Sequence, residues 1–226
     1  MTNTRTLLCA AILAATSAAA SAGDTFTNPV IRRSAPDPTV IRADDGHFYL
    51  YSTEDTPNTP IYRSDNLVDW TLIGTAFSDT SRPSWNPKGG IWAPDINKIG
   101  DKYVLYYSKS EWMGLKDAGV GVATADRPEG PFTDYGCVVS YHNTGVWCSI
   151  DPFFIEDEGR KYLIWGSYWD TFGIELTADG LSVKPGARKV HIASNFMEGS
   201  YVFKRGRYYY LFGSNGSCCE GANSTY

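Results

Sequence analysis

Apolar residues recur in the same short arrangement four times along the chain. Each copy is a short apolar run, a polar turn containing Asp, Glu, Arg or Gly, and a second run rich in Tyr, Val, Leu and Ile. Short runs of this composition, bounded by turn residues, predict β-hairpins. The four hairpins are expected at 37–52, 95–108, 151–167 and 198–214. A repeat of roughly 50 residues that is built from short strands is typical of a β-propeller.

A second pair of short strands follows each of the first three hairpins. The segments 60–70, 119–132 and 172–181 combine β-branched or aromatic residues with turn sequences such as Asp65-Asn66 and Asp179-Gly180. About four strands per repeat is what one propeller blade requires. We therefore predict an all-β chain that forms an incomplete propeller of about four blades, with no long helix.

Each predicted hairpin begins with a carboxylate, namely Asp37, Asp95, Asp151 or Glu198. The innermost strands of propeller blades start at one end of the central channel, so these side chains are expected to meet there. Like-charge repulsion makes such a ring costly, and a purely structural ring would use Ser, Asn or Gly. A lone Asp-Pro pair usually marks a turn, but two such pairs in register with two further acids indicate a functional site.

The beginning of the chain has the features of a secretory signal peptide. Arg5 provides a short positive region, residues 7–20 are apolar, and small residues at 20–22 form a cleavage site. The apolar stretch is too short to span a bilayer. We therefore expect residues 1–22 to be removed and residues 23–226 to form one exported domain, secreted or periplasmic and not anchored in a membrane.

The composition of the chain limits the classes of molecule that it is expected to bind. The net charge is −5 and no basic stripe is present, which argues against nucleic acid. Aromatic residues make up 14% of the chain, enough both for strand cores and for surfaces that stack against sugar rings.

Four cysteines remain after the signal segment is removed. Cys137 and Cys148 flank a loop and could pair in an exported protein. The neighbours Cys218 and Cys219 would pair only through a strained ring, and two free thiols in a loop are the simpler alternative. A metal site is the weaker interpretation, because no nearby His completes a set of ligands.

Four short motifs resemble the inner-strand signatures of glycoside hydrolase family 43. They are Ala-Pro-Asp-Pro at 35–38, Ile-Trp-Ala-Pro-Asp at 91–95, Ser-Ile-Asp-Pro at 149–152 and Met-Glu-Gly at 197–199. The turns at 64–70 and 125–132 are also similar to turns of that family. The resemblance runs from about Asn28 to the end of the chain. It implies a five-bladed β-propeller that hydrolyses arabinose- or xylose-containing plant polysaccharides and oligosaccharides with inversion.

The resemblance also implies roles for individual residues. Asp37 resembles the general base, or proton acceptor, and Glu198 resembles the general acid, or proton donor. Asp151 resembles the third carboxylate, which raises the pKa of the acid and orients it. An inverting reaction needs one ionised and one protonated carboxyl group, roughly 6.5–9.5 Å apart, with room for a water molecule between them.

Three further residues are expected near these carboxylates. Trp92 resembles an aromatic residue of the sugar site, and Asp95 is expected to support the site without touching the sugar. Ser167 borders the site on this interpretation, although a serine that merely ends a strand explains it equally well.

The expected substrate is α-L-arabinosidic, most simply arabinan. The segment 213–226 and the sequence Gly-Ser-Tyr-Trp at 166–169 resemble arabinan-cleaving members more than xylosidases. Exo and endo action are not distinguished, and a β-xylosidase or arabinofuranosidase of the same family remains an alternative. No cofactor is expected to be required, and the protein is expected to be a monomer.

One departure from the family is visible. The fifth inner-strand repeat is absent, so the resemblance implies a C-terminally truncated chain in which 23–226 is a partial catalytic domain. Family members often carry a His of that fifth blade near a channel-bound metal, commonly calcium. The histidines of this sequence, His47, His142 and His191, do not occupy that position, so a structural calcium belongs to the complete family fold and not to a motif found here.

Functions of other classes remain open alternatives. A non-catalytic carbohydrate-binding propeller would use the same aromatic residues but would not need three converging acids. A structural or protein-binding propeller would bind no sugar. A fructan-cleaving propeller is less favoured, because such enzymes usually begin with Asn before the Asp-Pro pair, whereas Pro36 precedes Asp37 here.

Overall fold

The computed structural model describes residues 25–112, 114–194 and 196–216. The expected signal peptide at 1–22 lies outside the described residues, and so do Cys218 and Cys219. No helix within the described part of the chain is long and apolar enough to cross a membrane.

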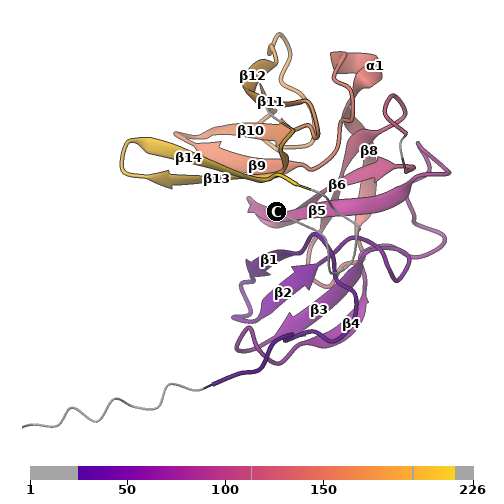
Figure 1. Cartoon of the computed structure of the whole chain (residues 1–226). Coiled ribbons are helices and arrows are strands. Elements are labelled where there is room, and N and C mark those ends of the chain that lie inside the picture. Colours follow the sequence, from indigo (N-terminus) through magenta and orange to yellow (C-terminus); the bar gives the residue numbers. More distant parts are fainter. Residues whose placement is uncertain (1–24, 113, 195, 217–226) are drawn as a thin grey trace, which may run out of the picture.

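The described residues form three four-stranded antiparallel sheets and one two-stranded sheet (Figure 1). The first sheet consists of β1 (Thr39–Arg42), β2 (Phe48–Tyr51), β3 (Pro60–Ser64) and β4 (Thr71–Thr75). The second consists of β5 (Gly90–Ile99), β6 (Lys102–Ser110), β7 (Gly119–Ala125) and β8 (Thr133–Ser140). A single helical turn, α1 (Tyr141–Thr144), follows β8. The third sheet consists of β9 (Phe153–Asp157), β10 (Arg160–Trp165), β11 (Asp170–Glu175) and β12 (Val190–Ser194), and the last of β13 (Glu198–Arg205) and β14 (Tyr208–Ser214).

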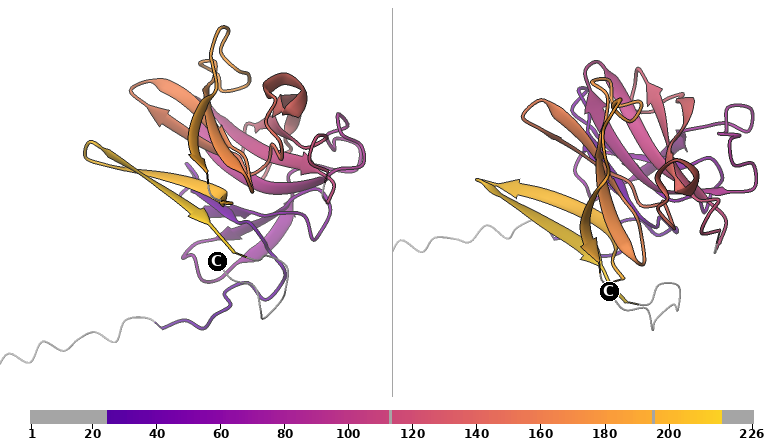
Figure 2. Two further views of the ribbon diagram at one scale, coloured as in Figure 1. Left: turned by 45° about the horizontal axis from the view of Figure 1, so that its top comes forward. Right: turned by 90° about the horizontal axis from the view of Figure 1, so that it is seen from above.

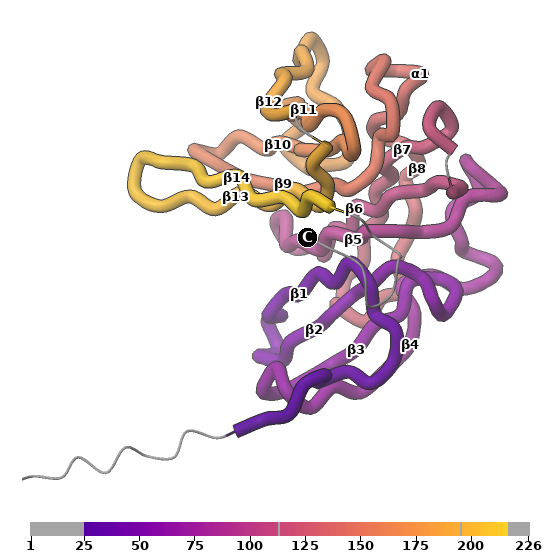
Figure 3. Tube along the Cα trace, viewed as in Figure 1, coloured from indigo at the N-terminus to yellow at the C-terminus, as the bar shows by residue number. Residues whose placement is uncertain are grey.

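The sheets follow one another around a common centre. The Cα trace visits the four sheets in sequence order (Figure 3). The first strands of successive sheets contact each other, β1 with β5, β5 with β9, and β9 with β13. Each sheet is therefore one propeller blade with its first strand innermost. The prediction of an all-β, incomplete propeller of about four blades is confirmed.

The core lies in two layers, one on each face of the second sheet. Side chains alternate between the faces of a strand, and β6 shows this directly. Leu105 and Tyr107 pack with the first sheet, while Val104 and Tyr106 pack with the third. Because the second sheet is covered on both faces, β6 and β7 are buried at every position except Lys102, and Trp165 of the third sheet is fully buried against them.

The fourth sheet is covered on one side only. Tyr201 packs on Phe153 of the third sheet, with ring centroids 5.0 Å apart. Other aromatic side chains of this hairpin are about half exposed, including Tyr208 and Phe212. In both views of Figure 2, the hairpin projects beyond the remaining sheets.

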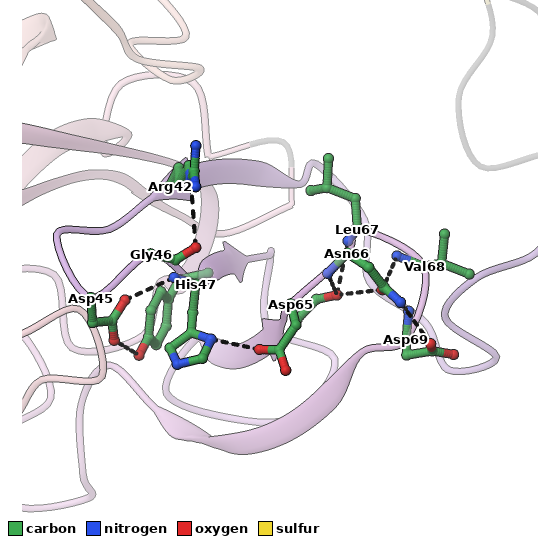
Figure 4. Close-up of polar contacts among 11 residues, drawn as sticks. Arg42, Asp45, Gly46, His47, Asp65, Asn66, Leu67, Val68 and Asp69 are labelled. Atoms are coloured by element: carbon green, nitrogen blue, oxygen red, sulfur yellow. Dashed lines mark hydrogen bonds and ion pairs between the residues drawn. The ribbon is translucent and has the colours of Figure 1, made fainter. Parts of the chain in front are cut away.

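The turn between β3 and β4 forms as its sequence predicts (Figure 4). The hydroxyl oxygen of Ser64 accepts the N–H of Leu67 at 2.9 Å, and the side-chain oxygen of Asn66 accepts the next two N–H groups at 2.9 and 2.8 Å. Leu67 is left-handed, with φ 66°. Asp65 points across to His47, whose Nδ1 lies 2.5 Å from the carboxylate. Local side-chain bonds of this kind compete well with continued strand pairing.

The disulfide considered between Cys137 and Cys148 is not formed. Both thiols are free. Cys137 lies on β8, where its thiol donates to the carbonyl of Val139 at 3.4 Å. Cys148 is buried in the loop before β9. The two residues flank a loop in sequence. In the fold, however, Cys137 is held in the pairing of β8 with β7, and Cys148 is buried separately in the loop before β9.

Candidate active site

Two aspartates occupy equivalent places at the start of the inner strands of the first and third blades. Asp37 lies two residues before β1 and Asp151 two residues before β9, and each is followed directly by proline. Both have left-handed backbones, with φ 50° and 58°. Residues other than glycine rarely adopt this conformation, and such strain concentrates at functional sites. The backbone here is therefore held by its surroundings and not by local preference.

Each aspartate is held by hydroxyl groups from a neighbouring strand end. The Thr53 hydroxyl donates to Oδ2 of Asp37. The Asp151 N–H donates to the hydroxyl of Ser108 at 2.9 Å, and Oδ2 of Asp151 accepts the N–H of Gly199 at 3.2 Å. Asp37 is exposed, whereas Asp151 is partly buried.

Ser167 links Asp151 to Glu198. Glu198 is the first residue of β13, and the buried Ser167 hydroxyl donates to its Oε2 at 3.3 Å. The same hydroxyl also lies close to Asp151 and favours the ionised form of Asp151 when its single hydrogen turns toward that residue. The structure therefore brings Asp151, Glu198 and Ser167 together from two blades.

The three acids also interact through their charges. Burial, together with the nearby charges of Asp37 and Glu198, raises the pKa of Asp151 to about 7 against the opposing effect of the Gly199 N–H. Burial also raises the pKa of the Cys148 thiol to about 12, again with contributions from Asp151 and Glu198. Asp37, Asp151 and Glu198, carried by three separate sheets, thus form one electrostatic cluster.

Asp95 begins the corresponding repeat of the sequence and was expected to support the site without touching the sugar. It lies in the middle of β5, after an irregularity in the β5–β6 pairing between Trp92 and Asp95. Its Oδ2 accepts the N–H of Phe154 at 2.7 Å and the side-chain amide of Asn97 at 2.9 Å. Burial raises the pKa of Asp95 to about 7, against these two hydrogen bonds. Because β5 begins earlier than its sequence indicates, Asp95 joins the second blade to the third instead of entering the cluster.

Trp92 lies on β5, where it pairs with Ser108 of β6. A Cβ atom at Gly90 would lie 2.4 Å from the indole Nε1 of Trp92, so only glycine leaves room for the ring. The residue after Trp92 is Ala93, whose N–H donates to the Thr53 hydroxyl at 2.7 Å. On the other side, Tyr168 follows Ser167 and is 40% exposed. Burial raises the pKa of Tyr168, with contributions from Glu198, Cys148 and Asp151.

Of the hydroxyl groups that hold the acids, sequence reasoning named Ser167 and missed those of Thr53 and Ser108. Ser108 lies near the end of β6, Ser167 follows β10, and Ser52-Thr53 follows β2. This recurrence of Ser or Thr was visible in the four repeats. It was a usable signal, because the end of the second strand lies beside the start of the first strand in every hairpin.

The metal expected in the family fold has no binding cluster within the described ranges. They contain no group of three or more His, Cys, Asp or Glu side chains that could hold an ion. His142 and His191 are exposed, and His191 faces Asp170 at 2.9 Å on the outer strands of the third blade. The residues that the structure describes therefore provide no calcium site of their own.

Comparisons with known proteins agree with this arrangement. The model of glycosyl hydrolases family 43 matches residues 26–226. A probable arabinan endo-1,5-α-L-arabinosidase A of Aspergillus flavus is 34% identical over 192 residues, covering 81% of this chain and 58% of the relative. The arabinan endo-1,5-α-L-arabinosidase A of Aspergillus niger is 32% identical over 193 residues, covering 81% and 59%. The chain thus spans less than two thirds of the length of these relatives.

Solved structures of the same kind share the fold. An α-L-arabinanase of Cellvibrio cellulosa superimposes with a TM-score of 0.75 at 28% identity, over 85% of this chain and 68% of the other. An exo-1,5-α-L-arabinanase from a bovine ruminal metagenomic library gives 0.73 at 31% identity, over 88% and 71%. These neighbours are five-bladed propellers, so the predicted fold class, an incomplete member of a five-bladed family, is confirmed. With its four blade repeats, its family match and these relatives, the chain belongs to glycosyl hydrolases family 43.

Proposed function

We propose that this chain carries the catalytic groups of an inverting glycoside hydrolase that cleaves α-L-arabinosidic bonds in arabinan. The observation that carries the proposal is the cluster of Asp37, Asp151 and Glu198, which converge from three blades and influence one another electrostatically. The relatives named above are arabinan-cleaving enzymes, and a further structural neighbour is an arabinanase complexed with arabinohexaose.

In this mechanism, Asp37 acts on water and Glu198 acts on the leaving sugar. A water molecule bonds to the anomeric carbon and gives its proton to Asp37, while the bond to the leaving oxygen breaks and that oxygen takes the proton of Glu198. The exposure of Asp37 suits a group that must reach water, and the Ser167 hydrogen bond suits a group that must be held in one orientation.

Asp151 supports the acid without touching the broken bond. Its Oδ2 is held by the N–H of Gly199, the residue that follows Glu198, and Ser167 contacts both carboxyl groups. A carboxyl group in this position, sharing Ser167 with Glu198 and binding the N–H of the next residue, holds Glu198 in one orientation. This orientation favours proton donation to the leaving oxygen.

Aromatic side chains beside the carboxylates are proposed to bind the sugar rings. Trp92 lies on the second blade, and Tyr168 and Trp169, which are 40% and 44% exposed, lie on the third. Ring faces of this kind stack on the apolar faces of sugars. Ser167 borders the same space and is proposed to contact substrate as well as Glu198.

We also propose that the protein acts outside the cytoplasm as a monomer. The signal-like features of residues 1–22 support export, with 23–226 as the catalytic part, and a polysaccharide substrate must be met outside the cell.

The test uses a completed propeller, in which this chain is fused to the segment of a family relative that it does not cover. Products are analysed on linear arabinan, branched arabinan, arabinoxylan and xylo-oligosaccharides. We expect arabinose or arabino-oligosaccharides from linear arabinan, with the product pattern distinguishing exo from endo action. NMR of the first product should show an inverted anomeric configuration. Release of xylose alone would replace arabinan by the xylosidase alternative, and release of no sugar by the folded protein would overturn the proposal.

The residue assignments are tested in the same protein. Asp37→Asn should lower turnover on every substrate by at least about a hundredfold, because it removes the group that accepts the proton of water. Glu198→Gln should slow substrates with poor leaving groups far more than activated aryl glycosides. An Asp37→Asn variant with nearly unchanged turnover would refute the role given to Asp37.

A further inference from the structure

Thr53 holds Asp37 in two ways and connects it to the next blade. Its N–H donates to the carbonyl of Pro36 at 2.9 Å, and its hydroxyl donates to Oδ2 of Asp37. The hydroxyl oxygen in turn accepts the N–H of Ala93 at 2.7 Å. Thr53 therefore fixes both the backbone before Asp37 and its carboxylate.

The direction of these hydrogen bonds follows from the groups involved. A backbone N–H can only donate, so the Thr53 oxygen must accept from Ala93. The single hydroxyl hydrogen is then free to point at Asp37, whose Oδ2 accepts it. A hydrogen bond to an ionised oxygen favours the ionised carboxylate. It also leaves the other oxygen, Oδ1, to take a proton from water.

Glu54 makes this support rigid. Its N–H donates to the carbonyl of Ile91 at 3.1 Å, and its Oε1 accepts the Ile91 N–H at 2.7 Å. Arg82 binds both oxygens of Glu54, at 2.5 and 2.6 Å. Burial alone would raise the pKa of Glu54, but the hydrogen bonds from Arg82, Asn58 and Ile91 outweigh it and lower that pKa. The strand segment that carries Ala93 is thereby fixed next to Thr53.

The geometry points to Thr53 as a positioning residue that orients Asp37 and commits its Oδ2 as an acceptor, so that Oδ1 receives the proton of the attacking water. This inference rests on the proposed role of Asp37 as general base. It adds that the ability of Asp37 to accept a proton depends on one hydroxyl group, that of Thr53. Thr53 follows β2, and the backbone N–H of Ala93 in the second blade fixes the orientation of its hydroxyl.

The test compares Thr53→Val, which removes the hydroxyl at nearly constant volume, with Thr53→Ser, which keeps it. Both are made in the completed propeller and assayed on linear arabinan from pH 4 to 9. We expect Thr53→Val to lower kcat about ten- to a hundredfold with KM changed less than about threefold, because one hydrogen bond to a charged group is lost. The acidic limb of its pH–rate profile should move to higher pH. Thr53→Ser should restore both quantities to within about threefold of the parent.

A matched control is available elsewhere in the chain. Thr177 also donates its hydroxyl to an aspartate, Asp179, at 2.6 Å, but in an exposed turn of the third blade. Thr177→Val should leave kcat and the pH profile unchanged. Crystal structures of the two Thr53 variants add a readout that needs no activity, since the Asp37 carboxylate should turn away in the Val variant and keep its place in the Ser variant.

The outcomes separate this inference from the function on which it rests. If Asp37→Asn abolishes turnover while Thr53→Val keeps the parent kcat and acidic limb, the positioning role is refuted and the proposed function stands. Equal losses in Thr53→Val and Thr53→Ser would also refute it, since packing and not the hydroxyl would then matter. If Asp37→Asn remains active, the role of Asp37 itself fails, whatever Thr53 does.

Discussion

Replacing Asp151 by Asn should change how stability depends on pH. The pKa of Asp151 is raised to about 7 in the folded protein, mainly by burial and further by Asp37 and Glu198. In the unfolded chain the same group titrates near 3.8. The folded state therefore binds more protons between these pH values, and the contribution of Asp151 to stability, fully present below about pH 4, is lost as the pH rises to about 7.

The size of the effect follows from the same two values. A rise of the pKa from 3.8 to about 7 corresponds to about 4 kcal/mol, at about 1.4 kcal/mol for each pH unit. Relaxation and water entry reduce this, so we expect Asp151→Asn to gain about 2–4 kcal/mol of unfolding free energy relative to the parent between pH 4 and pH 8. At pH 8 the variant should be the more stable protein. It should also be the less active one, as is common where an active site concentrates like charges.

The assay is urea unfolding of the 226-residue chain, followed by fluorescence of its 7 tryptophans at constant ionic strength from pH 4 to pH 8. Asp179→Asn provides the control. The pKa of Asp179 is lowered by hydrogen bonds from Thr177 and Leu181, so its contribution is lost only as the pH falls below its ordinary value. The difference between that variant and the parent should be constant from pH 5 to pH 8. A pH-independent difference for Asp151→Asn as well would refute the raised pKa and the cluster from which it arises.

Three further results are expected. Arg82→Met should lower the unfolding free energy by about 3–5 kcal/mol, because Glu54 would remain buried without its ionic partner, and the double change with Glu54→Gln should recover part of that loss in the same urea assay. Alkylation of the denatured, unreduced protein should label both Cys137 and Cys148 in peptide mass spectra, whereas protection of both would reveal a disulfide. Gly90→Ala should raise KM for arabinan in the completed propeller by about tenfold with little change in kcat, since the new methyl group would displace the neighbouring indole; unchanged KM would exclude that indole from substrate binding.

The blades could be predicted from the sequence because their signals are local. An apolar run, a polar turn and a second apolar run specify a hairpin almost independently of what surrounds it. The turn at 64–69 forms through bonds between residues at most three apart, and its sequence was sufficient to predict it. The carboxylates before β1 and β9 were likewise found, because proline marks the position after each of them.

The surroundings of Asp95, Thr53 and Lys109 could not be predicted from the sequence, because they depend on contacts between segments that are far apart in the chain. Asp95 occupies the expected place in the repeat, but the longer pairing of β5 with β6 carries it into mid-strand. The role of Thr53 requires a backbone N–H from Ala93, forty residues away. Lys109 is fully buried and donates to the carbonyl of Gly89 at 2.6 Å, and burial lowers its pKa to about 8. A lysine in that run of sequence would ordinarily be assigned to the surface.

The placement of one acid on each of three sheets has a consequence for recombination within the family. Any single crossover between Asp37 and Glu198 places the acids in segments from different parents, and their spacing then depends on how blades of the two parents meet. Crossovers in the outer strand pairs, β3–β4, β7–β8 and β11–β12, leave every inner strand joined to its own blade edge. Shuffled libraries should therefore place their junctions within those outer strand pairs, where a junction does not interrupt an inner strand or the acid at its start.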